Sequence, residues 1–289
     1  MEWGEWRDLP GLGKMGSHVL AELLDGGQSF RWEKIPDLVD GWQGVFSDIV
    51  LQAGLDSQRN TRYRLPAGSR QGSQVQEYFA TGMDWERVAD SLPWRSDKEL
   101  AAAMESFPGL RILRQPFGET LFAFLCSTAK QIPQIKQCCL NVAKRFGPRL
   151  PGGNYGWPGW EALARAGEGP LRECKLGYRA KFVARVAERL ARETDFEGRI
   201  LSAAYPEAKK LLLDLPGVGE KVADCVLLFG AGKLEAFPVD TWITKAMTNM
   251  YGLEGWTPHS VAHFGRIHFG EAAGYAQQFL FARERRLRV

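Results

Sequence analysis

Apolar and polar side chains alternate in short runs between residues 28 and 80. The runs are QSFRWEKI at 28–35, GWQGVFSDIVLQ at 41–52 and TRYRLP at 61–66, with Gly, Asp and Asn between them. Alternation with a period of two is typical of strands that bury one face, and short turns join neighbouring strands in antiparallel order. We therefore expect an antiparallel β-sheet over residues 28–80.

From about residue 84 apolar positions recur every three or four residues, and this helical pattern continues to the end of the chain. One helix is expected over 132–146, starting near Pro133 and ending at Gly147-Pro148. The loop LPGGNYGWPG at 150–159 is expected to separate two helical lobes. The predicted fold class is α+β, with an antiparallel β domain and flanking helices at 1–113 and a mostly helical domain in two lobes at 114–289.

Residues 206–230 predict two helices joined by a tight hairpin. The first helix starts at Pro206, whose fixed φ suits the first helical position, and Leu215-Pro216 ends it. Gly217 and Gly219 permit a positive φ or a close approach of the backbone. A second amphipathic helix follows Gly219, with an apolar face made by Val222, Val226 and Phe229.

The free amides of this hairpin, at Gly217, Val218 and Gly219, predict an anion site. Amides at a helix start lack partners within the helix, and the helix dipole adds positive charge, so a phosphate suits them. An ordinary turn between two helices is the alternative, because a Gly-x-Gly pattern alone is weak evidence.

Lys221 lies in the first turn of the second helix, where the dipole favours Asp or Glu instead. The positive helix end and any desolvation would favour the neutral, nucleophilic form of its amine. A lysine that extends into solvent or only touches a phosphate is the alternative. Asp240 directly precedes the periodic run Ile243, Ala246, Met247 and Met250, so it is expected to cap a helix, which also suits an ionised group that stabilises positive charge on a sugar.

These residues resemble the helix-hairpin-helix superfamily of DNA glycosylases and, more closely, the 8-oxoguanine DNA glycosylase/AP lyase family. Further segments resemble that family in its order, namely GGQSFRW at 26–32, RILRQPFGETLFAFLCS at 111–127, RFGPRL at 145–150, LGYRAKF at 176–182 and GYAQQFLF at 274–281. The resemblance therefore covers residues from about 20 to about 284.

The resemblance implies that Lys221 attacks C1′ of the damaged nucleoside, expels the base and forms a Schiff base that undergoes β-elimination. Asp240 would stabilise the oxocarbenium-like transition state. Cys225 and Phe281 would cover the two faces of the flipped base. Gln277 would bind its Watson-Crick edge, and the carbonyl of Gly27 would accept the N7 proton that 8-oxoguanine has and guanine lacks.

The opposite-strand residues depart from the family pattern. The family's asparagine that fills the gap left by the flipped base falls on Ala129, and an arginine that reads the orphaned cytosine falls on Gln134. Tyr178 and Arg179 match the wedge tyrosine and the second cytosine-reading arginine, whereas Trp242 stands where the family often has a phosphate-binding histidine. We expect a relaxed preference for cytosine opposite the lesion.

Composition agrees with a DNA-binding enzyme that is not polybasic. The 289 residues are 45% hydrophobic and carry a net charge of only +3, so DNA affinity is expected from a local patch of Arg145, Arg149, Arg179 and Lys181. The expected partner is double-stranded DNA containing an oxidised purine, bound by a monomer.

Several features argue against other classes. The five cysteines form no metal-ligand pattern, and His259 and His263 lack a third ligand nearby, so we expect neither a metal nor a cofactor. No apolar signal core or membrane span occurs, which predicts a soluble protein of the cytoplasm, associated with the nucleoid in a bacterium. The tail RERRLRV at 283–289 is expected to be a solvated helix end.

Two other functions stay open. The first is a glycosylase of the same fold for another damaged purine, such as an alkylated base, although relatives that use water generally lack the lysine. The second is a DNA-binding module without catalysis, which would not need Lys221, Asp240 and Gln277 together.

Overall fold

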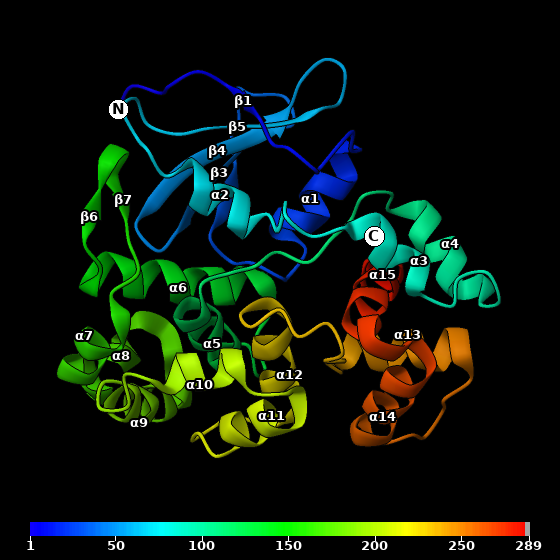
Figure 1. The fold of residues 1–289 in the computed structure, drawn as a ribbon. Helices are drawn as coiled ribbons and strands as arrows, with labels where there is room; N and C mark the ends of the chain where they lie inside the picture. Colours follow the sequence, from blue (N-terminus) through cyan, green and yellow to red (C-terminus); the bar gives the residue numbers. More distant parts are fainter. Residues whose placement is uncertain (287–289) are drawn as a thin grey trace.

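A five-stranded antiparallel sheet forms the upper layer of the molecule (Figure 1). The computed structural model describes residues 1–286. The strands lie in the order β1-β5-β4-β3-β2, with bounds Arg7–Asp8 (β1), Trp32–Lys34 (β2), Trp42–Phe46 (β3), Ile49–Leu55 (β4) and Thr61–Arg64 (β5). In β3, buried residues alternate with half-buried ones, as the sequence pattern predicted.

The sheet differs from the prediction at both ends. Strand β1 was not expected, because two exposed residues are too few to show a period. At the other end, Gly72–Tyr78 forms helix α2, so the sheet ends at Arg64 and not near residue 80. Helix α1 (Ser17–Asp25) packs its apolar face, which includes the fully buried Leu20 and Leu23, into the core beside the sheet.

The rest of the chain is mostly helical, which confirms the predicted fold class. The helices are α3 (Trp85–Ser91), α4 (Lys98–Ser106), α5 (Phe117–Cys126), α6 (Ile132–Phe146), α7 (Gly159–Ala166), α8 (Glu168–Leu171), α9 (Ala180–Leu190), α10 (Phe196–Ser202), α11 (Tyr205–Leu213), α12 (Glu220–Phe229), α13 (Thr241–Tyr251), α14 (Pro258–Phe269) and α15 (Ala273–Arg286). Helix α6 has the bounds that the sequence predicted.

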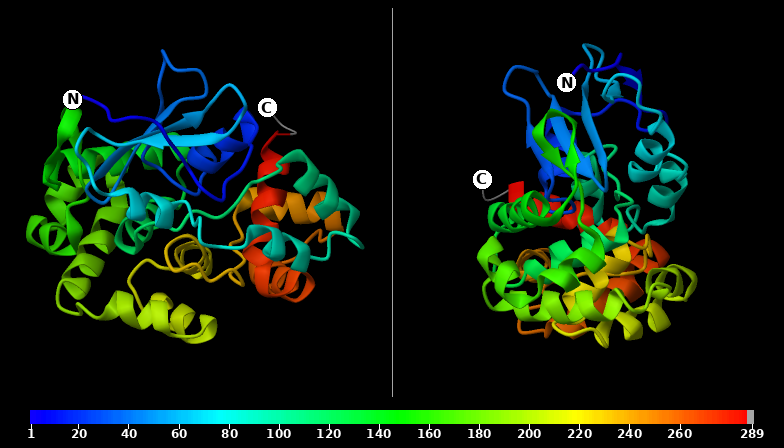
Figure 2. Two further views of the ribbon diagram at one scale, coloured as in Figure 1. Left: turned by 45° about the horizontal axis from the view of Figure 1, so that its top comes forward. Right: turned by 90° about the vertical axis from the view of Figure 1, so that its left-hand side faces the viewer.

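The helices form two groups in space (Figures 1 and 2). Helices α5 to α12 lie below the sheet, with the buried α5 at their centre, and α13 to α15 lie beside them. Helix α4 packs against α15, so residues before and after 113 both contribute to the second group. The division of the chain at residue 113 stays a prediction.

The predicted loop at 150–159 instead contains a small hairpin. Strands β6 (Arg149–Leu150) and β7 (Asn154–Tyr155) pair across it. The amide of Trp157 donates to the carbonyl of Ser47 at 2.8 Å, and the Gln43 amide donates to Asn154 at 3.3 Å. The segment therefore joins the helical part to the sheet and does not mark a boundary between lobes.

The tail is not a solvated helix end over the part that the structure describes. Arg283 forms an ion pair with Glu99 at 2.8 Å, and Arg285 forms one with Glu22 at 3.1 Å, because α15 lies between α4 and α1. Residues 287–289 of the predicted tail lie outside the described residues. Within residues 1–286 no helix combines the length and apolarity that a bilayer span requires.

Candidate functional site

The predicted hairpin lies between α11 and α12, and its two glycines differ in backbone conformation and in the space around them. Gly217 has φ +81°, and a Cβ there would lie 2.6 Å from the ring of Phe182. Gly219, the residue before α12, is extended (φ −108°), and nothing lies within 4 Å of the position its Cβ would take. The space beside the positive end of α12 is therefore open to a ligand such as a phosphate. Val218 is buried between them, and its amide donates to the carbonyl of Leu215 at 3.2 Å, so it is not one of the free amides that the sequence predicted.

Lys221 extends from the first turn of α12 toward the end of α5. Its Nζ donates to Oγ of Ser127 at 2.8 Å and lies 5.2 Å from the ring centre of Phe124. The Ser127 hydroxyl donates in turn to the carbonyl of Phe124 at 2.8 Å, so its oxygen is free to accept from the amine. The side chain is thus held by a specific contact and does not simply extend into solvent.

Asp240 caps α13, as the sequence predicted. Its Oδ1 accepts hydrogen bonds from the amides of Trp242 and Ile243, both at 2.9 Å. Because both bonds use the same oxygen, Oδ2 lies outside the cap. The carboxylate has a fixed rotamer and a second oxygen with which to act.

Cys225 brings the two charged groups into one site. Burial raises the pKa of the Cys225 thiol to about 12, the charge of Lys221 opposes the rise, and the charge of Asp240 adds to it. Both groups must lie near the thiol to act on it electrostatically. Lys221 and Cys225 therefore lie one helical turn apart on α12, and Asp240, at the start of α13, is near enough to affect the thiol.

Gln277 is buried on α15 and bonded to the segment that leads to Asp240. Its Nε2 donates to the carbonyl of Pro238 at 3.0 Å, and its Oε1 accepts from Gln278 at 2.7 Å. An amide side chain has two donor hydrogens and two acceptor lone pairs. One donor and one acceptor of Gln277 thus stay available to a ligand.

Gly27 and Phe281 lie side by side although 254 positions separate them in the sequence. Gly27 has φ +113°, and a Cβ there would lie 3.2 Å from Cδ1 of Ile132 and 3.7 Å from Cζ of Phe281. The structure therefore brings together Gly27 and Phe281, two residues that the resemblance assigns to the same base pocket.

The predicted opposite-strand residues lie in different environments. Tyr178 is 56% exposed, whereas Arg179 is 8% exposed and donates to the carbonyl of Gly217 at 3.1 Å. Gln134 accepts from the amide of Gln131 at 2.9 Å and so helps to cap α6. The structure thus gives Arg179 and Gln134 local structural contacts, and their DNA-reading roles stay predictions.

Ala129 and Trp242 are the two remaining positions that depart from the family pattern. Ala129 has φ +58°, a conformation that Asn adopts more readily than Ala. The ring of Trp242 lies 5.4 Å from the Lys245 ammonium.

Of the predicted cationic patch, Arg145 is paired with Glu173, whereas Arg149 and Lys181 are exposed.

The structure also shows contacts that the sequence did not indicate. Ser127, Ile132 and Gln115 all contact predicted site residues or their neighbours, and the Gln115 amide donates to the carbonyl of Gln28 at 2.7 Å. Their positions follow from tertiary contacts, and only Ser127 and Gln115 lie within segments of the family resemblance.

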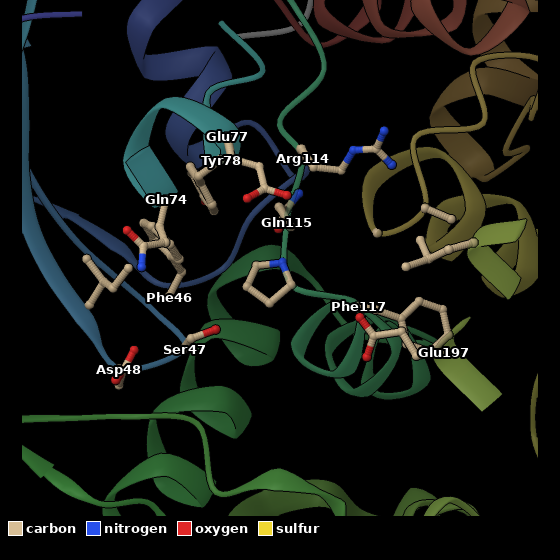
Figure 3. A pocket seen from close by; sticks show the side chains of 15 residues that line it. Phe46, Ser47, Asp48, Gln74, Glu77, Tyr78, Arg114, Gln115, Phe117 and Glu197 are labelled. Atoms are coloured by element: carbon tan, nitrogen blue, oxygen red, sulfur yellow. The ribbon is translucent and has the colours of Figure 1, made fainter. Parts of the chain in front are cut away.

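The cavity in Figure 3 is a separate feature, although Gln115 is among the residues that line it. It has a volume of about 550 Å³ and is surrounded by Asp48, Glu77, Arg114 and Glu197, among others. Neither Lys221 nor Asp240 lines it. Within residues 1–286 no three His, Cys, Asp or Glu side chains are grouped so that they could hold a metal ion, and all five cysteines are free thiols.

Comparisons with known proteins find similarity to DNA glycosylases. The model of the 8-oxoguanine DNA glycosylase N-terminal domain matches residues 15–121. The chain is 29% identical to the N-glycosylase/DNA lyase of Saccharomyces cerevisiae, over 92% of this chain and 83% of that protein. It is 45% identical over 116 residues to a probable N-glycosylase/DNA lyase of Methanothermobacter thermautotrophicus, a match that spans 40% of this chain and 37% of the relative.

A solved structure with a similar fold is that of the Clostridium acetobutylicum 8-oxoguanine glycosylase/lyase in complex with double-stranded DNA that contains cytosine opposite 8-oxoguanine. The TM-score is 0.87 at 28% identity, and the match covers 100% of both chains. The similarity therefore includes the sheet, both groups of helices and the hairpin.

Proposed function

Because the chain belongs to the 8-oxoguanine DNA glycosylase family, we propose that it excises 8-oxoguanine from duplex DNA and cleaves the strand at the resulting abasic site. It is a bifunctional enzyme, a DNA N-glycosylase and a DNA lyase. The observation that carries the chemistry is the Lys221 amine, held by Ser127 beside Cys225 and Asp240.

Lys221 acts as the nucleophile. Its nitrogen bonds to C1′ as the bond from C1′ to the base breaks, and the base leaves with the bonding electrons. Asp240 stabilises the positive charge that develops on the sugar. Loss of a proton from the amine and opening of the sugar give a Schiff base, whose C2′ proton is then removed as the 3′ phosphate leaves.

The lesion is read by the other half of the site. Phe281 and Cys225 enclose the faces of the flipped base, and stacking on an aromatic ring contributes about 1 to 3 kcal/mol per base. The Gly27 carbonyl accepts the N7 proton of 8-oxoguanine. Against guanine the same carbonyl would face a lone pair, which costs on the order of 1 to 3 kcal/mol for an unsatisfied buried acceptor.

DNA with the lesion in a duplex is the partner, bound by a monomer. The open space beside Gly219 receives a phosphate at the positive end of α12, and exposed cations such as Arg149 and Lys181 add affinity that falls with salt. The enzyme works where the DNA is, at the nucleoid of the cytoplasm if the cell is bacterial.

Borohydride trapping tests the proposed function. Incubation with an 8-oxoguanine duplex and borohydride should give a covalent protein–DNA adduct that Lys221→Gln abolishes. Lys210→Gln, at an exposed position of α11, is the matched control and should trap normally. Excision without an adduct would favour a glycosylase that uses water, and binding without excision would favour a DNA-binding module.

We also propose a relaxed choice of the opposite base. The methyl group of Ala129 is too small to fill the gap that the flipped base leaves. Gln134 caps α6, and Arg179 donates a hydrogen bond to the carbonyl of Gly217. Each lost base-reading contact weakens discrimination by about 1 to 3 kcal/mol. The rate of excision should vary modestly among duplexes with the lesion opposite each of the four bases. One base-reading contact corresponds to a preference of up to about a hundredfold. A cytosine preference above that value would contradict the proposal.

A further inference from the structure

The turn at Gly26 and Gly27 is fixed from both sides. At Gly26 a Cβ would lie 2.1 Å from the Glu22 carbonyl and 2.3 Å from its carboxylate Oε1, so the space for a side chain is already occupied. On the far side, Gln28 donates to the carbonyl of Arg111 at 2.9 Å and accepts from the amide of Leu113 at 3.0 Å. The turn is therefore held by contacts on both of its sides.

Arg285, in the last turn of α15, holds the near side of this turn. Its Nη1 donates to the carbonyl of Gly26 and to Oε1 of Glu22, the latter at 3.1 Å. Its guanidinium also lies 5.4 Å from the ring centre of Phe281, one helical turn earlier on α15. One side chain thus contacts both the turn that carries Gly27 and the ring beside Gly27.

The pairing is partly removed from water. The side chains of Arg285 and Glu22 are 26% and 16% exposed. Burial raises the pKa of the Glu22 carboxyl, and the charge of Arg285 opposes that rise. Glu22 and the Gly26 carbonyl would both lose a charge-assisted hydrogen bond if the guanidinium were removed.

We infer that Arg285 is a positioning residue for lesion discrimination, which sets the Gly27 carbonyl and the Phe281 ring at the separation that a flipped 8-oxoguanine requires. The inference rests on the proposed function. A hydrogen bond to N7 depends on a donor–acceptor distance near 2.9 Å, so a small displacement of the turn weakens it. Lys221 and Asp240 lie on other elements, and Arg285 has no hydrogen bond to either of them.

The test compares two reactions of each variant under single-turnover conditions. The first is excision of 8-oxoguanine, which needs the base to be read. The second is strand cleavage at a preformed abasic site, which needs only Lys221 and the backbone contacts. Arg285→Met should slow the excision of 8-oxoguanine by about tenfold or more, because one charge-assisted hydrogen bond is lost. The rate of cleavage at the abasic site should stay within about threefold of wild type.

Two further variants complete the design. Arg283→Met removes a similar ion pair from the same helix, because Arg283 bonds to Glu99 at 2.8 Å, outside the turn. It should leave both reactions unchanged. Arg285→Lys keeps the positive charge but lacks the planar guanidinium group, so it should excise 8-oxoguanine faster than Arg285→Met and more slowly than wild type.

The outcomes separate this inference from the proposed function. An equal loss of both reactions in Arg285→Met would show a general role in folding and overturn the inference. Unchanged excision in that variant would overturn it as well, with the proposed function intact. A wild-type protein that excises no 8-oxoguanine would sink both.

Discussion

Replacing Asp240 with Asn should separate two roles of one side chain. The carboxylate caps α13 through Oδ1, which accepts from the amides of Trp242 and Ile243 at 2.9 Å each. The carbonyl oxygen of Asn can accept the same two bonds, and Asn caps helices about as well as Asp. We expect the free energy of unfolding of Asp240→Asn to lie within about 0.5 kcal/mol of wild type, whereas Asp240→Ala should lose about 1 kcal/mol.

Catalysis should respond in the opposite way. The amide carries no negative charge, so it cannot stabilise the positive charge on the sugar. A preorganised electrostatic group of this kind is worth about 3 to 4 kcal/mol, and we expect both variants to excise 8-oxoguanine about 10² to 10³ times more slowly. Single-turnover excision and urea unfolding on the same preparations measure the two effects. Excision by Asp240→Asn within about threefold of wild type would refute a catalytic role and leave only the cap.

Two other substitutions test the hairpin. Gly217→Ala should destabilise the fold by about 1 to 2 kcal/mol or more, because the φ of Gly217 is +81° and a Cβ there would contact the ring of Phe182. Gly219→Ala should keep the melting temperature of wild type but bind duplex DNA more weakly. Equal DNA affinity of Gly219→Ala and wild type would argue against a phosphate there. A third substitution tests an ion pair outside the hairpin. Lys209→Met should lower the free energy of unfolding by about 3 kcal/mol, because Lys209 pairs with the buried Asp224 at 3.1 Å. Lys210→Met, at an exposed position, should leave the free energy of unfolding unchanged, and urea unfolding measures both variants.

Elements with local signals could be predicted from the sequence. Helix α6 has its start and end signals within the chain itself, at Pro133 and at Gly147-Pro148, and its bounds were predicted correctly. The hairpin at Gly217 and Gly219 and the cap at Asp240 were also predicted correctly, because turns and caps depend on neighbours a few residues away.

Elements that depend on distant contacts could not. The strands at 149–155 are two residues each, and contacts with the sheet through Ser47 and Gln43 stabilise them. The charged tail looked solvated, but Arg283 and Arg285 find acidic partners 184 and 263 positions earlier. Nothing in the local pattern could indicate those partners.

The same distinction divides the site. Lys221, Cys225 and Asp240 lie within 20 residues of one another, so the residues proposed for the cleavage chemistry belong to one short segment. The proposed lesion-reading half instead requires the turn after α1 to contact α15, through Gly27, Phe281 and Arg285. A substitution at that junction should therefore slow the excision of 8-oxoguanine, while strand cleavage at a preformed abasic site stays close to wild type.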